Sequence, residues 1–286
     1  MSTIAAALPS LPPEVVDAII DELQSSPYLY QRTPDYYEWK AQAAERVQLL
    51  GACSLVSKSW LPRSRHFLFM GVFLCNLPLD RAMAFLDLLD SPHSTISPYV
   101  RTLTLEEAQS TWLNAVLPRC TAFHSVEALN ITNGCFHLQR PPTEDVASFF
   151  ASLRKLRILS LTRCTFATYA QLHEALHSIP SLEYLLLSDN FVMNHSETDA
   201  VSTAPPPFAL KYLSISPIDG KGGMMEWLAL SGQEIPKISL GSIESKDSGA
   251  IAHFLLALGP FLKSLVLEFT PRRFAADAQG VPMELT

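Results

Sequence analysis

The chain has 286 residues, of which 48% are hydrophobic and 17% are charged, so it can bury a sizeable core and is not disordered as a whole. Its net charge is −7 and it has no run of lysine or arginine. Both features argue against a nucleic-acid ligand, because binding to phosphates requires a basic face.

Three features predict a protein of the cytoplasm or the nucleus. The first residues lack the basic segment and long apolar stretch of a secretory signal. The five cysteines are scattered without a Cys-x-x-Cys pair, as expected in a reducing compartment, so we expect no bound metal and no cofactor. The most apolar late segment, 250–262, is far shorter than the roughly 20 residues that span a bilayer, so we expect no membrane contact.

Residues 8–75 are predicted to form a small helical module. The segment Ser10-Leu11-Pro12-Pro13-Glu14 is typical of a helix start, since it combines a capping hydroxyl, an early proline and an acid near the positive end of the dipole. The apolar residues that follow share one helical face: Val15, Val16, Ile19, Ile20 and Leu23. A second apolar stretch covers 47–60, and Pro62 is expected to stop or kink its helix.

Short helices bury little area by themselves, so the surplus apolar residues of this module need another surface. These residues are Leu11, Ile19, Leu55, Val56 and Trp60. One interpretation is that they pack on the first repeat of the following domain and act only as its cap.

The segments 11–20 (Leu-Pro-Pro-Glu-Val-Val-Asp-Ala-Ile-Ile) and 53–65 (Cys-Ser-Leu-Val-Ser-Lys-Ser-Trp-Leu-Pro-Arg-Ser-Arg) together resemble an F-box, particularly that of the F-box-like proteins of mushroom-forming fungi. The resemblance covers residues 8–70. It implies docking on the Skp-type linker subunit of a cullin-based ubiquitin ligase, ahead of a substrate-reading domain that often consists of leucine-rich repeats. The residues implied in linker contact are Leu11, Pro12, Glu14, Ile19, Leu23, Leu55, Val56 and Trp60.

The module departs from the compact family pattern at residues 24–46, which are rich in tyrosine and include Trp39. We expect an inserted loop or a partial helix there. Two interpretations remain open: the insertion obstructs linker docking, or it is an elaboration of this lineage. Ser57 stands where the family often has cysteine and changes little.

Residues 98–270 contain the template Leu-x-x-Leu-x-Leu, with aliphatic substitutions, seven times at a spacing of 25 to 30 residues. The copies begin at Val100, Val126, Leu156, Leu182, Leu210, Ile235 and Leu262. A period of this length is typical of stacked units that bury their apolar faces on one another. We therefore predict an α/β fold, in which an irregular leucine-rich-repeat solenoid of about seven strand–helix units, with a parallel sheet, follows the helical module.

Helices between the strands are predicted at 81–89, 111–117, 144–153, 168–179, 224–230 and 248–258. The position three after the last strand leucine, often Asn or Cys in such repeats, holds Cys164 and Asn190 in two units. The remaining units that we compared differ there, with Ala108, Gly134, Ile218 and Ile243. Residues 271–286 form a tail, and the end of the array needs a cap from this tail or from a partner, unless the array is a shortened one.

Small polar residues between the strand leucines are expected on the concave face of the array. They are Thr104, Asn130, Ser160, Ser214 and Ser239. The first four are our candidates for contact with a protein substrate, although an idle solvated face has the same composition.

His173-Glu174-Ala175-Leu176-His177 matches the zinc-protease pattern His-Glu-x-x-His, and Glu197 is conceivable as a third ligand. The same helix must bury Leu172, Leu176 and Ile179 for its repeat. This packing predicts that His173, Glu174 and His177 lie on the convex, solvent-facing side, where nothing excludes water. We therefore expect neither a metal site nor a catalytic site, and no enzyme.

The sequence favours a non-enzymatic adaptor, whose helices bind a Skp-type linker and whose repeats hold a protein substrate. The alternative is a leucine-rich-repeat scaffold whose N-terminal helices are only a cap. A zinc hydrolase is the third and least supported hypothesis.

Overall fold

The fold is that of an α/β protein, in a computed structural model that describes residues 11–24, 36–91, 94, 96–106, 112–136, 144–192, 204–216, 218 and 221–269. Its centre is an eight-stranded sheet in the order β1-β2-β3-β4-β6-β8-β9-β10, in which every neighbouring pair is parallel. The strands are β1 (Gly71–Cys75), β2 (Thr102–Glu106), β3 (Ala128–Thr132), β4 (Ile158–Thr162), β6 (Tyr184–Ser188), β8 (Tyr212–Ile215), β9 (Lys237–Ile243) and β10 (Ser264–Phe269).

All seven copies of the template supply a strand, from β2 to β10, as predicted. The sheet has an eighth strand, β1, which we did not predict. Its residues Val72 and Leu74 are buried and follow Phe69 at the template spacing, so an aromatic first position concealed this copy.

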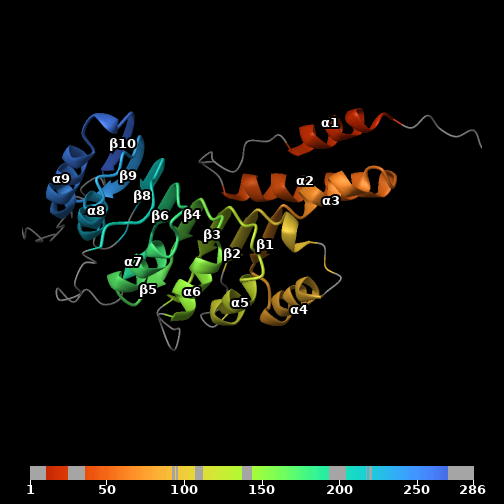
Figure 1. Cartoon of the computed structure of the whole chain (residues 1–286), viewed down its shortest axis with the longest axis horizontal. Helices are drawn as coiled ribbons and strands as arrows, with labels where there is room; N and C mark the ends of the chain where they lie inside the picture. The colour runs from red at the N-terminus through yellow and green to blue at the C-terminus, as the bar shows by residue number, and fades with distance from the viewer. Residues whose placement is uncertain are drawn as a thin grey trace, which may run out of the picture.

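Helices lie between the strands and cover one face of the sheet, as Figure 1 shows for α4 to α7. Each of the six predicted helices has a counterpart: α4 (Leu79–Asp90), α5 (Trp112–Cys120), α6 (Glu144–Ser152), α7 (Tyr169–His177), α8 (Lys221–Ala229) and α9 (Ser248–Leu258). Smaller elements complete the pattern, namely η1 (Ser97–Tyr99), η3 (Ser245–Asp247), η4 (Gly259–Phe261) and the strand pair β5 (Thr165–Phe166) and β7 (Phe191–Val192).

Successive side chains along each strand point alternately toward the core and toward the opposite face of the sheet. Leu103, Leu129, Leu159 and Leu185 are in register on successive strands, fully buried beneath the helices. The residues between the buried ones point to the other side. We call this side, opposite α4 to α9, the polar face.

Four strands are followed directly by a residue in the left-handed conformation, and β9 contains one just before its end. Asn76, Asn133, Arg163, Asp189 and Ser242 all have φ between 51° and 58°. Such a residue turns the chain sharply out of the strand, a conformation that only glycine adopts without cost.

Asn190 forms hydrogen bonds to backbone groups at the turn after β6, as predicted from its position three residues after the last template leucine. The side chain is buried, its Oδ1 accepts the Cys164 amide at 2.8 Å, and its Nδ2 donates to the Leu161 carbonyl at 2.9 Å. The equivalent position at the end of β9 holds Ile243, whose side chain has no polar group. There the buried Lys221 of α8 donates from Nζ to the carbonyls of Gly241 and Ser242 at 2.6 and 2.9 Å.

Charged residues alternate in sign immediately before five neighbouring strands: Arg101, Glu127, Arg157, Glu183 and Lys211. Glu183 accepts a hydrogen bond from Arg157 at 2.6 Å and lies 3.0 Å from Lys211 Nζ. The Arg157 hydrogen bond holds the pKa of Glu183 below its ordinary value. Arg101 lies 3.6 Å from Glu127, so each of these contacts joins opposite charges that precede adjacent strands.

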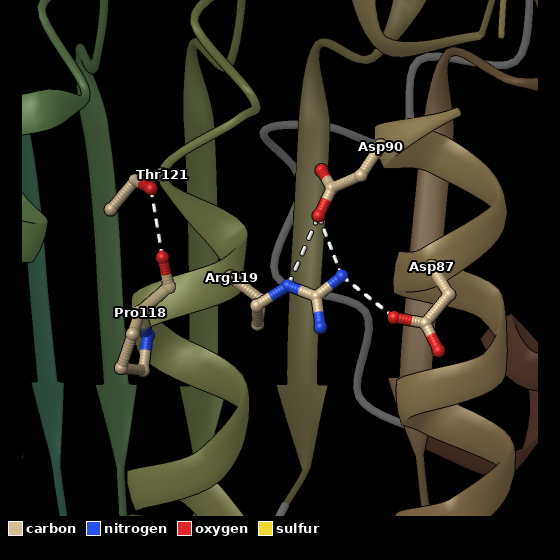
Figure 2. A network of polar contacts seen from close by, with 5 residues as sticks. All are labelled: Asp87, Asp90, Pro118, Arg119 and Thr121. Atoms are coloured by element: carbon tan, nitrogen blue, oxygen red, sulfur yellow. Dashed lines mark hydrogen bonds and ion pairs between the residues drawn. The ribbon is translucent and has the colours of Figure 1, made fainter. Parts of the chain in front are cut away.

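On the helical side, α4 and α5 are joined by Arg119. Its guanidinium donates to Asp90 and Asp87 of α4 at 2.5 and 2.8 Å, as Figure 2 shows. All three groups are solvent-accessible, so the network orients the two helices but adds little to stability.

Candidate partner-binding surfaces

The N-terminal helices α1 (Pro13–Gln24), α2 (Tyr36–Val56) and α3 (Leu61–Leu68) have a small core of their own. It consists of Val16 and Ile20 from α1 and Leu50 from α2, with Trp60, Phe67 and Leu68 packed against it. This core is separate from the one beneath the sheet.

Arg63 of α3 holds α1 in place. Its guanidinium donates two hydrogen bonds to Asp21 Oδ1 and one to Oδ2, at 2.6 to 2.9 Å, and stands 4.8 Å from the centre of the Phe67 ring. Bidentate pairing fixes orientation as well as distance, so α1 has a defined angle on α3.

The outward sides of α1 and α2 carry large apolar residues. On α1 the exposed fractions are 51% for Leu11, just before the helix, 42% for Val15 and 39% for Ile19. On α2, Leu55 is 86% exposed and Val56 62%. Isolated exposed apolar residues are ordinary, but this many on two helices make their outward sides a candidate partner-binding surface.

The residues proposed for linker contact therefore divide into two groups. Pro12, Glu14 and the apolar residues named above are exposed. Leu23 and Trp60 are only half-exposed, and Trp60 packs on the small core. Trp60 therefore contributes mainly to the packing of α1 to α3.

The segment 24–46 is not a separate loop over its whole length. From Tyr36 onward it is the first part of α2, which continues without a break to Val56. Residues 25–35, and the expected capping residue Ser10, lie outside the described residues. Pro62 does not end α2: it lies in the first turn of α3, where its missing N–H is harmless.

The polar face brings the candidate substrate-contact residues into one line. Thr104, Asn130 and Ser160 are in register on β2, β3 and β4, and Asn130 donates to the Thr104 hydroxyl at 3.3 Å. All three are half-exposed. Ser214 and Ser239 continue the line on β8 and β9, but they are 8% and 3% exposed, which leaves little of either for a partner.

The polar face also carries three larger residues that we did not predict as contact residues. Leu186 of β6 stands between Ser160 and Ser214, and Tyr184 pairs in register with Tyr212 beside it. All three are half-exposed. The signal was present, because each occupies a position between template leucines, but we selected only small polar residues there.

The prediction for the His-Glu-x-x-His helix is wrong at His173. Glu174 is exposed and His177 half-exposed, but His173 is 2% exposed. Its ring stacks on Trp227 of α8 with centroids 4.3 Å apart and planes 17° from parallel. Trp227 also lies beside His177, with ring centroids 5.7 Å apart, so it contacts the flank of α7 at both histidines.

Burial lowers the pKa of His173 to about 4, with a smaller contribution from His177. Neither ring nitrogen has a hydrogen-bond partner among the described residues. A stacked, buried imidazole is a packing element, and no group of three His, Cys, Asp or Glu side chains suited to a metal occurs in the described part of the chain. Glu197 lies outside it.

No described helix is long and apolar enough to cross a membrane. The chain matches no protein-family model and no curated protein sequence.

Proposed function

We propose that the protein is a substrate-recognition adaptor of a cullin-type ubiquitin ligase. In this proposal α1 to α3 dock on a Skp-type linker, and the polar face, as the inner surface of a leucine-rich-repeat array, holds a protein substrate. The adaptor performs no chemistry. It raises the local concentration of a substrate lysine near the enzyme that carries ubiquitin.

The observation that supports the proposal is the exposure of Leu55 and Val56 on helices with a separate core. A cap would turn its surplus apolar residues toward the sheet, and they would join the core there. Here they remain outside it, as the docking face of an adaptor requires.

The test is the affinity of the full chain for a Skp-type linker subunit, measured by calorimetry. Leu55→Asp places a charge where apolar area should be covered, so binding should weaken at least about tenfold. Leu256→Asp is a matched control, because Leu256 is 80% exposed on α9, outside the proposed docking helices. Absence of linker binding by the unmodified chain, or equal effects of the two variants, would contradict the proposal.

The alternative function, a scaffold with an N-terminal cap, makes a different prediction about deletion. Removing residues 1–69 leaves β1 in the sheet, whereas a deletion to residue 75 would also remove that strand. A terminal cap covers the apolar end of a repeat array, so its loss should weaken the folding of the repeats that it covers. If the chain without residues 1–69 no longer unfolds in a cooperative transition, the cap function is favoured. If the cooperative unfolding transition remains, the adaptor function is favoured.

A further inference from the structure

The middle of the polar face has no charge. None of the residues that β3, β4, β6 and β8 turn toward this face is acidic or basic. The chain as a whole has 28 acidic and 21 basic residues, so an uncharged area across four strands stands apart from its general composition.

The charges immediately before three of these strands are paired with one another. Arg157, Glu183 and Lys211 precede β4, β6 and β8, and both cations contact the same carboxylate, at 2.6 and 3.0 Å. A charged group of a partner that entered the middle of the polar face would lose hydration and find no counter-charge among the residues that β3, β4, β6 and β8 turn toward it. Burial without compensation of this kind is strongly unfavourable.

An apolar and aromatic cluster lies on this face at the beginning of β6 and β8. Tyr184 and Tyr212 are register partners on adjacent strands, and Leu186 is two residues beyond Tyr184 on the same side. Tyrosine combines a large apolar surface with a hydroxyl and is frequent where binding energy is concentrated. Beside the cluster, Ser160 and Asn130 offer hydrogen-bonding groups suited to peptide amides.

We infer that the polar face binds an uncharged segment of a protein partner, with an apolar side chain of that segment seated on Tyr184, Leu186 and Tyr212. The inference rests on the proposed function in taking this face as the substrate-reading surface. It adds the chemistry of the substrate: neutral polar and apolar residues, bound by contact and by hydrogen bonds to Asn130 and Ser160. Acidic, phosphorylated and strongly basic segments are excluded by the same argument.

The experiment uses the immobilised full chain and a phage-displayed library of random dodecapeptides. Selected peptides should be poor in Asp, Glu, Lys and Arg and should share an apolar or aromatic residue. Synthetic copies should bind with an affinity that hardly changes with NaCl concentration, because no ion pair is screened. Tyr184→Ala and Tyr212→Ala should each weaken binding at least about tenfold.

Two further variants sharpen the result. Ser160→Asp introduces a charge in the uncharged area and should weaken binding of the same peptides, whereas Glu174→Ala, on the helical side, should not. Thermal unfolding of each variant distinguishes lost binding from lost folding. Enrichment of charged peptides, binding that salt abolishes, tyrosine variants that bind normally, or no enrichment over the Tyr184→Ala/Tyr212→Ala double variant would each overturn the inference.

Failure of this inference and failure of the proposed function give different results. Linker affinity is measured on the same preparations. Peptide binding without linker binding contradicts the adaptor and leaves the inference intact, whereas linker binding together with any of the overturning outcomes contradicts the inference alone.

Discussion

Leu267 of β10 is the register partner of Leu240 of β9, yet Leu267 is 37% exposed and Leu240 is fully buried. The two leucines occupy the same position of the template and face the same side of the sheet. They differ because β10 is the edge strand of the described sheet, so among the described residues no strand pairs with its outer side.

This pair gives a first prediction. Leu240→Ala should lower the free energy of unfolding by about 3 kcal/mol, since it removes buried area and leaves a cavity, and Leu267→Ala by only about 1 kcal/mol. Urea denaturation measures both. Equal costs would mean that Leu267 is covered in solution, by residues after Phe269 or by a second molecule.

Leu50 and Leu55 give a second matched pair, both on α2. Leu50 is 2% exposed in the small helical core and Leu55 is 86% exposed. Leu50→Ala should destabilise α1 to α3 by about 2–4 kcal/mol, whereas Leu55→Ala should change stability by less than about 0.5 kcal/mol. Hydrogen exchange of the α1 and α2 amides reports these changes locally, and strong deprotection by Leu55→Ala would contradict the exposed position.

Asn190 allows a test of the turn contacts. Asn190→Ala leaves the Cys164 amide and the Leu161 carbonyl without their side-chain partner, which should cost about 3 kcal/mol. Asn130→Ala removes one longer hydrogen bond on the half-exposed polar face and should cost less than about 1 kcal/mol. Calorimetry measures the loss in free energy of unfolding for both variants. Similar losses would contradict a special role of the Asn190 contacts in the turn.

His173 makes stability depend on pH. Its pKa is about 4 in the folded protein and 6.5 ordinarily, so between these values the unfolded chain binds the proton and the folded one does not. Above about pH 6.5 the imidazole is neutral in both states, and the free energy of unfolding is at its full value. It falls by about 3 kcal/mol as the pH approaches 4.

The measurement is the free energy of unfolding against pH for the unmodified chain and for His173→Phe, which keeps a ring on Trp227 and has no titrating group. The difference between the two curves should change across this pH range. His124→Gln, at an exposed histidine, serves as the control for the loss of a histidine. Parallel curves for His173→Phe and the unmodified chain would contradict the stacked, neutral imidazole.

The local pattern of apolar residues was sufficient to predict most of the strands and helices. The strand register follows from the template, because Leu103, Leu129 and Leu159 recur at nearly equal spacing and must all face the helices. The turn position of Asn190 could be predicted for the same reason. These features depend on residues within one unit or on its direct neighbour.

What the sequence did not predict depends on contacts between distant segments. His173 is buried by Trp227, a residue more than fifty positions later, and its own helix gave no indication of that neighbour. The small core around Leu50 likewise joins α1 and α2 across residues 25–35. The cluster of Tyr184, Leu186 and Tyr212 became apparent only when the strands were placed side by side.

The charges before β2, β3, β4, β6 and β8 alternate from Arg101 through Glu127, Arg157 and Glu183 to Lys211. Because neighbours attract in this order, deleting any one of the three inner units would place two like charges side by side, and duplicating one would do the same. Like charges on adjacent strands repel. Loss or duplication of two adjacent inner strand–helix units would keep the alternation, so the row of charges opposes a change by one inner unit.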